Sequence, residues 1–219
     1  MKKSLLTAVF ALAFPFQSIA GTYDDLITGA KMGDTREIRT LAAKGASLDT
    51  TDIDGNTLLM LAARDGHAEL TEFLANNRAK LNARNAAGDT ALGLAALRGH
   101  LRVVELLVSA GAALDVPGWP PLVYAAFNGH GDISAYLISK GADLNAASEN
   151  GTTALMAASR GGYMELVRTL LRHKADINKQ MDSGETALDI ALKFKNTDIG
   201  ELLRAAGGKS GKSVHIEIR

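Results

Sequence analysis

Three of the five histidines, His67, His100 and His130, each follow a glycine and recur at spacings of 33 and 30 residues. Regularly placed imidazoles are candidates for metal binding or proton transfer, because histidine is the commonest metal ligand and titrates near neutral pH. Zinc ligands lie about 2.0–2.1 Å from the ion, whereas matching positions in adjacent helical units lie about 10 Å apart. The three rings therefore cannot converge on one ion, and we interpret them as structural turn residues. His173 and His215 have no partner at ligand-like spacing, so no metal site is predicted.

A second candidate for chemistry is the segment 206–213, which reads Ala-Gly-Gly-Lys-Ser-Gly-Lys-Ser and satisfies a relaxed P-loop pattern. A phosphate-binding loop of this kind needs a strand before it and a helix after it. Here a helical pattern precedes the segment, and only six residues follow Ser213. We therefore interpret it as a flexible linker and expect no cofactor.

The last six residues, Val-His-Ile-Glu-Ile-Arg, alternate apolar and polar side chains in the pattern of a strand. Such a strand would either add to a sheet edge of a partner or remain a tail. We favour the tail and assign residues 209–219 to a flexible C-terminal segment.

Enzyme chemistry has little support elsewhere in the chain. There are no cysteines, which excludes disulfides, thiolate metal sites and a cysteine nucleophile. Acidic residues are scattered, and neither a carboxylate pair nor a Ser/His/Asp set can be placed in one cleft. The 24 basic and 24 acidic residues balance, whereas a nucleic-acid-binding protein would be expected to have a basic excess. We expect neither an enzyme nor a nucleic-acid partner.

The N-terminus has the layout of a secretory signal peptide. Lys2 and Lys3 precede an apolar run of about ten residues, and Ser18-Ile19-Ala20 places small residues before a cleavage point at Gly21. A membrane-spanning helix needs about twenty apolar residues, so an uncleaved anchor is the weaker alternative. We predict a signal peptide over residues 1–20 and a periplasmic location, with release to the medium as the second option.

The elements that must position any functional residue repeat at a fixed period. Each unit contains a three-residue motif, here called the slot: Thr or Pro, then Ala, Leu or Pro, then Leu. The slot begins at Thr57, Thr90, Pro120, Thr153 and Thr186. The spacings between these positions are 33, 30, 33 and 33 residues. A glycine lies two residues before each slot, and in four units another lies nine residues after it. An amphipathic stretch with apolar residues at three- and four-residue steps comes next, which indicates a helix with one buried face. A Gly-Ala-x-Leu-Asp/Asn turn closes several units.

This pattern resembles the ankyrin repeat over residues 21–208. The resemblance implies an all-α ankyrin-repeat solenoid of about six units, each a helix-turn-helix with a β-hairpin loop, and an N-terminal capping unit at about residues 23–52. Some departures are visible: Arg78 and Lys174 replace the closing glycine, and Lys195-Asn196 replaces Gly-His in the last unit.

The resemblance also implies a concave face built from loop tips and the exposed side of each first helix. Nine residues in this register are predicted to bind a partner: Arg64, Asp65, Leu97, Arg98, Trp119, Phe127, Asn128, Arg160 and Phe194. The same register places Asn56, Asp89, Thr152, Gly161, Glu185 and Lys193 on this face. Large apolar side chains on a polar face suggest an interaction surface, and aromatics and Arg dominate binding energy at interfaces.

Trp119 and Phe127 are the expected anchors, with Leu97, Arg98 and Arg160 around them. In the alternative, Trp119 folds against nearby prolines at positions 117, 120 and 121 and only plugs the shortened loop. The 30-residue spacing shortens this loop by three residues, which would leave a notch in the face.

The function that follows is that of a periplasmic protein-binding module. A more specific version is an inhibitor or immunity protein that caps the active site of a secreted hydrolase. The alternative is a scaffold or stabilising helper for a periplasmic enzyme, such as an oxidative-stress enzyme. We expect a monomer that has no membrane contact after signal cleavage.

Overall fold

The computed structural model describes residues 19–211, so nearly all of the predicted signal peptide and most of the predicted tail lie outside the described residues. Within this range twelve helices form six helix-turn-helix units. The inner helices are α1 (Ile19–Met32), α3 (Leu58–Arg64), α5 (Ala91–Arg98), α7 (Pro121–Phe127), α9 (Ala154–Gly161) and α11 (Ala187–Lys193). The outer helices are α2 (Thr35–Ala43), α4 (Ala68–Asn76), α6 (Leu101–Ser109), α8 (Gly131–Ser139), α10 (Met164–Arg172) and α12 (Thr197–Ala205).

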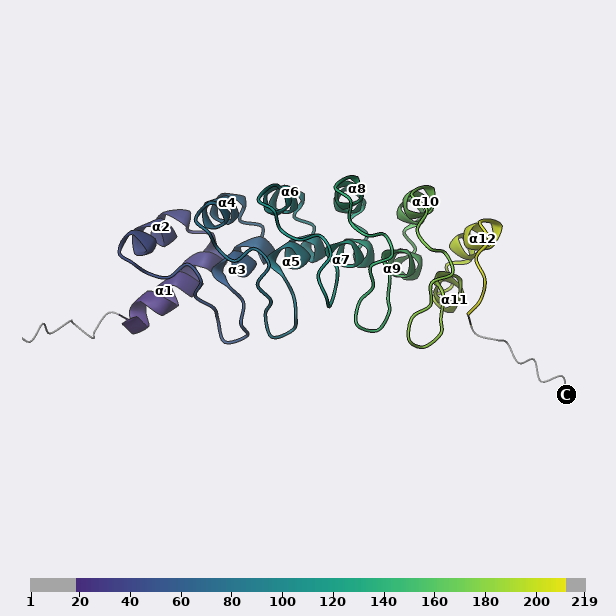
Figure 1. Cartoon of the computed structure of the whole chain (residues 1–219), viewed down its shortest axis with the longest axis horizontal. Helices are drawn as coiled ribbons and strands as arrows, with labels where there is room; N and C mark the ends of the chain where they lie inside the picture. The colour runs from purple at the N-terminus through teal and green to yellow at the C-terminus, as the bar shows by residue number, and fades with distance from the viewer. Residues whose placement is uncertain (1–18, 212–219) are drawn as a thin grey trace, which may run out of the picture.

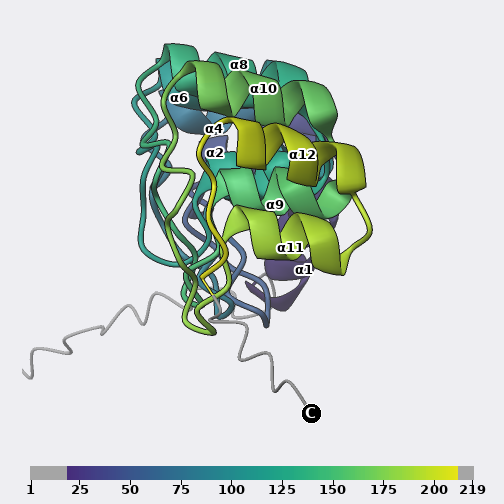
Figure 2. The ribbon, with the colours of Figure 1, turned by 90° about the vertical axis from the view of Figure 1, so that its right-hand side faces the viewer.

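The inner and outer helices form two stacked rows, and the outer row lies on the convex side of a shallow arch (Figure 1). Seen from the end, the long loops between successive units project to one side of the helices (Figure 2). The predicted all-α solenoid of about six units is confirmed. In the predicted hairpin loops, the described residues contain two isolated antiparallel bridges, Thr51 with Thr57 and Ala147 with Thr153.

The repeated Thr slots start the inner helices. Thr57, Thr90, Thr153 and Thr186 are N-cap residues, and each side-chain oxygen accepts a hydrogen bond from the backbone N–H three residues later. Such a cap satisfies one of the four N–H groups that the first turn leaves without a partner. In α7 a proline pair replaces the cap, which is tolerated because Pro121 at the first helical position needs no N–H.

The buried core runs between the two helix rows rather than around one centre. On the inner helices, the Ala pairs 62–63, 95–96 and 125–126 are fully buried, which lets adjacent helices approach closely. Leu70, Leu107, Leu137 and Leu170 of the outer helices are likewise inaccessible. No single unit encloses its own apolar face, so each unit is stabilised mainly by its neighbours.

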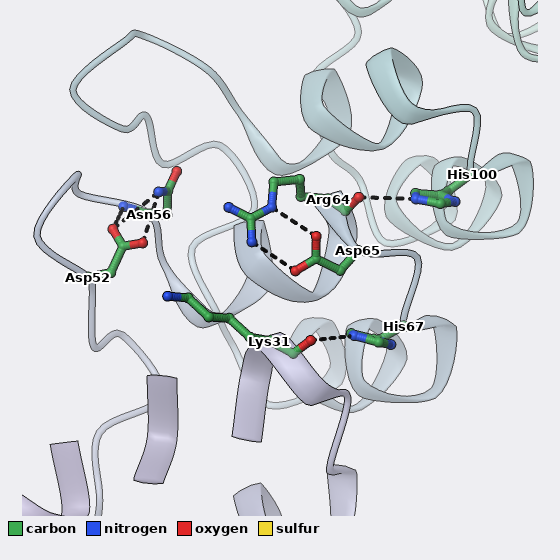
Figure 3. Close-up of polar contacts among 7 residues, drawn as sticks. All are labelled: Lys31, Asp52, Asn56, Arg64, Asp65, His67 and His100. Carbon is green, nitrogen blue, oxygen red and sulfur yellow. Dashed lines mark hydrogen bonds and ion pairs between the residues drawn. The ribbon is translucent and has the colours of Figure 1, made fainter. Parts of the chain in front are cut away.

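The repeated histidines connect one unit to the next. Each ring nitrogen Nε2 lies within hydrogen-bond distance of a carbonyl oxygen near the end of the preceding inner helix: His67 with Lys31 (2.8 Å), His100 with Arg64 (3.0 Å) and His130 with Leu97 (3.2 Å). The first two contacts are drawn in Figure 3. In the last unit, Asn196 takes this role and donates to the carbonyls of Ser159 (2.8 Å) and Arg160 (3.0 Å). The structural interpretation of these three histidines is confirmed.

The closing turns also connect successive units, through their final Asp or Asn. These side chains accept hydrogen bonds from a backbone N–H in the next turn: Asn82 from Ala113, Asp115 from Asp143, Asn145 from Asp176 and Asn178 from Lys209. The last pair shows that residues 207–211 form the closing turn of the sixth unit. Within the described range, no helix has the length and apolar character needed to cross a membrane.

Candidate binding groove

A groove on the concave face, between the inner helices and the loops, collects four of the nine predicted binding residues. Trp119, Phe127, Arg160 and Phe194 line it, together with apolar side chains that include Met156 and Ile190. Its volume of about 240 Å³ lies below the roughly 300–1,000 Å³ usual for small-molecule sites. The lining residues come from three successive units. A groove of this length suits an extended segment of another macromolecule better than a small molecule.

Trp119 is held by aromatic neighbours. Its ring stacks on Tyr124 with centroids 5.3 Å apart and planes 18° from parallel, and it meets Phe127 edge-on at 6.2 Å and 88°. Both contacts have the offset-stacked or edge-to-face geometry that aromatic pairs prefer. Trp119 and Phe127 stay half-buried, so they point neither into the core nor wholly into solvent. Trp119, Tyr124 and Phe127 therefore form a cluster of contacting rings, here called the aromatic wall. Trp119 belongs to it although it lies at the end of the short loop before α7.

Tyr124 was not among the predicted residues, yet it fixes this wall. Its hydroxyl donates a short hydrogen bond to the carboxylate of Asp89 in the preceding loop. Burial, the hydrogen bond and the charge of Asp89 together raise the pKa of the Tyr124 phenol above its ordinary value. Gly93 of α5 lies opposite this ring, and a Cβ there would be 3.4 Å from it, at van der Waals distance.

Arg160 lies between two aromatic rings from the units on either side. Its guanidinium carbon is 5.1 Å from the ring centre of Phe127 on the unit before and 4.9 Å from that of Phe194 on the unit after. Both distances are within the reach of a cation–π attraction. The register predicted Phe127 and Arg160 at matching points of successive inner helices and Phe194 one position further along in the next unit, and the structure brings the three side chains into contact.

Two residues that the register placed on the exposed face are buried, so that prediction is wrong for them. Asn56 is 7% exposed and Glu185 is 8% exposed. The amide of Asn56 donates to Asp52, and its oxygen accepts from Asn85 of the next loop at 2.8 Å. Glu185 accepts from Lys193 (3.0 Å) and Ser183 (2.7 Å). The position before the slot faces a neighbouring loop or its own helix, because the loops stack against one another.

Arg64 and Asp65 form a pair at the end of α3, away from the groove. The guanidinium of Arg64 donates two hydrogen bonds to the Asp65 carboxylate, at 2.9 and 2.8 Å (Figure 3). This fork holds the pKa of Asp65 below its ordinary value and raises that of Arg64. Each charge therefore already has a partner, which leaves this pair less available to another protein.

The remaining predicted residues also lie outside the groove. Asn128 caps the end of α7 and donates its amide to the carbonyl of Leu97 at 2.6 Å. Leu97 is half-buried and Arg98 is exposed at the end of α5. Neither Leu97 nor Arg98 lines the groove that contains Trp119, and their place around the two anchors stays a prediction.

The donors of the P-loop-like segment are used within the protein. The Ser210 hydroxyl and the Gly211 N–H both donate to the Asp189 carboxylate of α11. Burial alone would raise the pKa of Asp189, but hydrogen bonds from Ser210, Thr186 and Gly211 outweigh it and hold the pKa below its ordinary value. These two donors are therefore hydrogen-bonded to an internal carboxylate. Positions 212 and 213 lie outside the described residues.

The sequence matches a family model for ankyrin repeats (three copies) at residues 26–117, 78–148 and 122–213. The chain belongs to the ankyrin-repeat family. Among solved structures, this ankyrin-repeat protein is similar to the human ASB11 ankyrin repeat domain, at 24% identity and a TM-score of 0.76. The match covers 85% of this chain and 89% of that domain, and it bears on the fold alone. No curated protein matches the sequence. Ankyrin repeats generally mediate protein–protein interaction.

Proposed function

We propose that this ankyrin-repeat protein binds another protein through the groove lined by Trp119, Phe127, Arg160 and Phe194. The observation that carries the proposal is the clustering of three aromatic rings and an arginine on one accessible groove. Trp and Arg are the residue types most enriched at interface hot spots, together with Tyr. The rigid aromatic wall adds to this, because pre-organised side chains lose little entropy on binding.

We further propose that the chain acts in the periplasm on a periplasmic partner. The basic start, short apolar run and small residues at positions 18 and 20 support export. An inhibitor or immunity protein of a secreted hydrolase is the favoured version, because a groove between loops suits a protruding loop of an enzyme. In Figure 1 the loop before α7 reaches less far than its neighbours.

Affinity capture from periplasmic extract tests the binding function. The tagged chain is expressed with its own N-terminus in a bacterial host, and bound proteins are identified by mass spectrometry. We expect wild type to retain a partner that the Trp119→Ala/Phe127→Ala variant loses. The matched control is Arg102→Ala/Glu105→Ala on the outer helix α6, which changes an exposed ion pair on the convex side and should retain the partner.

If the double variant folds and captures the same partners as wild type, the groove is not the binding site. Adding the chain to the captured partner then separates the two functional versions. An inhibitor lowers the turnover of a hydrolase partner, whereas a stabilising helper leaves turnover unchanged and lengthens the partner's half-life on heating.

A further inference from the structure

We infer that the groove recognises a partner segment that carries a carboxylate beside a large apolar side chain, and that Arg160 receives the carboxylate. The inference rests on the proposed protein-binding function and names the chemistry of the segment that fits. Three features support it: Arg160 has no ion-pair partner among the described residues, the lining next to it is apolar, and the other charged groups of the groove pair with each other.

Arg160 is a cation without an anionic partner among the described residues. Arg64 and Lys193, which occupy the same register position on other inner helices, are paired with Asp65 and Glu185. No carboxylate of the described range lies within ion-pair distance of Arg160, whose exposed side chain meets Phe127 and Phe194 instead. Stacking occupies the faces of a guanidinium and leaves its in-plane N–H groups available. A carboxylate matches that planar fork with two parallel hydrogen bonds.

The space beside Arg160 is apolar. Met156, Ala157 and Ile190 line it, and so does Trp119. The volume of about 240 Å³ suits one or two side chains better than a drug-sized ligand. A segment that places a Leu or Phe here brings a neighbouring carboxylate to Arg160, and burial of the side chain from water favours binding.

Arg160 is the cation of the groove that a ligand carboxylate can pair with. Lys193, the other cation that lines the groove, already pairs with Glu185 at 3.0 Å. The planar fork of one guanidinium matches the two oxygens and the single charge of one carboxylate. The groove spans three successive units, so the carboxylate is that of an Asp or Glu side chain within a continuous segment.

Peptide titration tests the inference, with Trp119, the single tryptophan of the chain, as the fluorescent reporter. The first probe is an acetylated and amidated pentapeptide of sequence Gly-Phe-Glu-Phe-Gly. The second has Gln in place of Glu. The third is acetyl-Gly-Phe-Gln-Phe with a free C-terminal carboxylate. We expect the first probe to bind about tenfold or more tightly than the second and the third, the loss typical of a charged hydrogen bond. Tighter binding of the third probe than of the first would assign the carboxylate to a chain end and overturn the inference.

Arg160→Gln should abolish this preference and leave weak binding by the apolar side chains. Arg160→Lys keeps the charge without the planar fork, so it should restore only part of the preference. Arg102→Gln on the outer helix α6 is the matched control and should bind as wild type does. Equal binding of all three probes, an unchanged preference in Arg160→Gln, or no saturable binding would overturn the inference.

Two further outcomes separate alternatives. The chain itself contains Ile-Glu-Ile at positions 216–218, which resembles the first probe. If the first probe binds through Arg160 only in the Glu217→Gln variant, the ligand of the groove is this segment of the chain and not a partner protein. That result would overturn the inference. In the capture experiment, a partner lost by Trp119→Ala/Phe127→Ala but fully retained by Arg160→Gln would leave the binding function intact and overturn the carboxylate assignment alone.

Discussion

Removal of the His100 side chain is a direct test of how the units hold together. His100 stands between two units, with its Nε2 3.0 Å from the carbonyl oxygen of Arg64. Its ring lies flat against the turn before it, where a Cβ on Gly66 would come within 2.8 Å of the ring. His100→Ala therefore deletes a hydrogen bond and a packing contact at the same boundary.

The expected cost follows from these two losses. A hydrogen bond between partly exposed groups contributes about 1 kcal/mol, and loss of the ring contact raises the total to roughly 1–2 kcal/mol. In an array of this length, about 1 kcal/mol lowers the melting temperature by about 2–4 °C. We therefore expect His100→Ala to melt about 2–8 °C below wild type, measured by circular dichroism at 222 nm.

Two matched variants make the result specific. His100→Asn should recover part of the loss, because Asn196 makes the equivalent contacts in the last unit. His173→Ala should change little, because the His173 ring contacts a carbonyl of its own helix, Thr169, at 2.9 Å. A His100→Ala protein that melts with wild type, or a His173→Ala protein that falls equally, would refute the idea that these histidines connect the units.

Three other changes have predictable effects on stability. Gly99→Ala should lower the melting temperature, because Gly99 has φ +82 and its new Cβ would lie 2.6 Å from the His130 ring. Made in a His130→Ala background, where that clash is absent, the same change should lower the melting temperature less but still lower it. Lys174→Gly should raise the melting temperature slightly, because Lys174 has φ +66 and the left-handed conformation costs a non-glycine residue about 1–2 kcal/mol. Asp189→Asn should destabilise the last unit at neutral pH in urea titrations. Because the folded-state pKa of Asp189 is lowered, its contribution is present above about pH 4 and is lost as the pH falls through the folded value.

Each of these has a contradicting result. Equal melting temperatures of His130→Ala and Gly99→Ala/His130→Ala would show that the backbone angle costs nothing. A lower melting temperature for Lys174→Gly would show that the lysine side chain contributes more than its backbone costs. A difference between wild type and Asp189→Asn that grows on acidification would mean that the carboxylate is not the stabilising form.

The units and their boundaries were predictable because the recurring residues have local roles. Thr90 caps its own helix three residues away, and Gly99 ends that helix in a left-handed conformation. Such roles depend on neighbours in the chain, so they repeat wherever the same residues recur. The contact of Arg160 with Phe127 was also implicit, since the register places both at the same point of successive inner helices, and Phe194 follows one position further along in the next unit.

The features that could not be predicted depend on contacts between loops. Asn56 looked exposed, but its partner Asn85 lies 29 residues later in the next loop. Tyr124 reaches Asp89 35 residues earlier, and the only sign of it in the sequence is the small residue at Gly93. The side chains near the slot differ from unit to unit. The repeat pattern therefore does not show which of them form hydrogen bonds between neighbouring loops.

Hydrogen–deuterium exchange of the protein with its captured partner tests the central claim most directly. Binding in the groove predicts slower exchange in loops 110–120, 140–153 and 173–186, which bear or flank the side chains of the groove, with little change in outer helices α6, α8 and α10. Protection confined to those outer helices, with the three loops unchanged, would contradict the account.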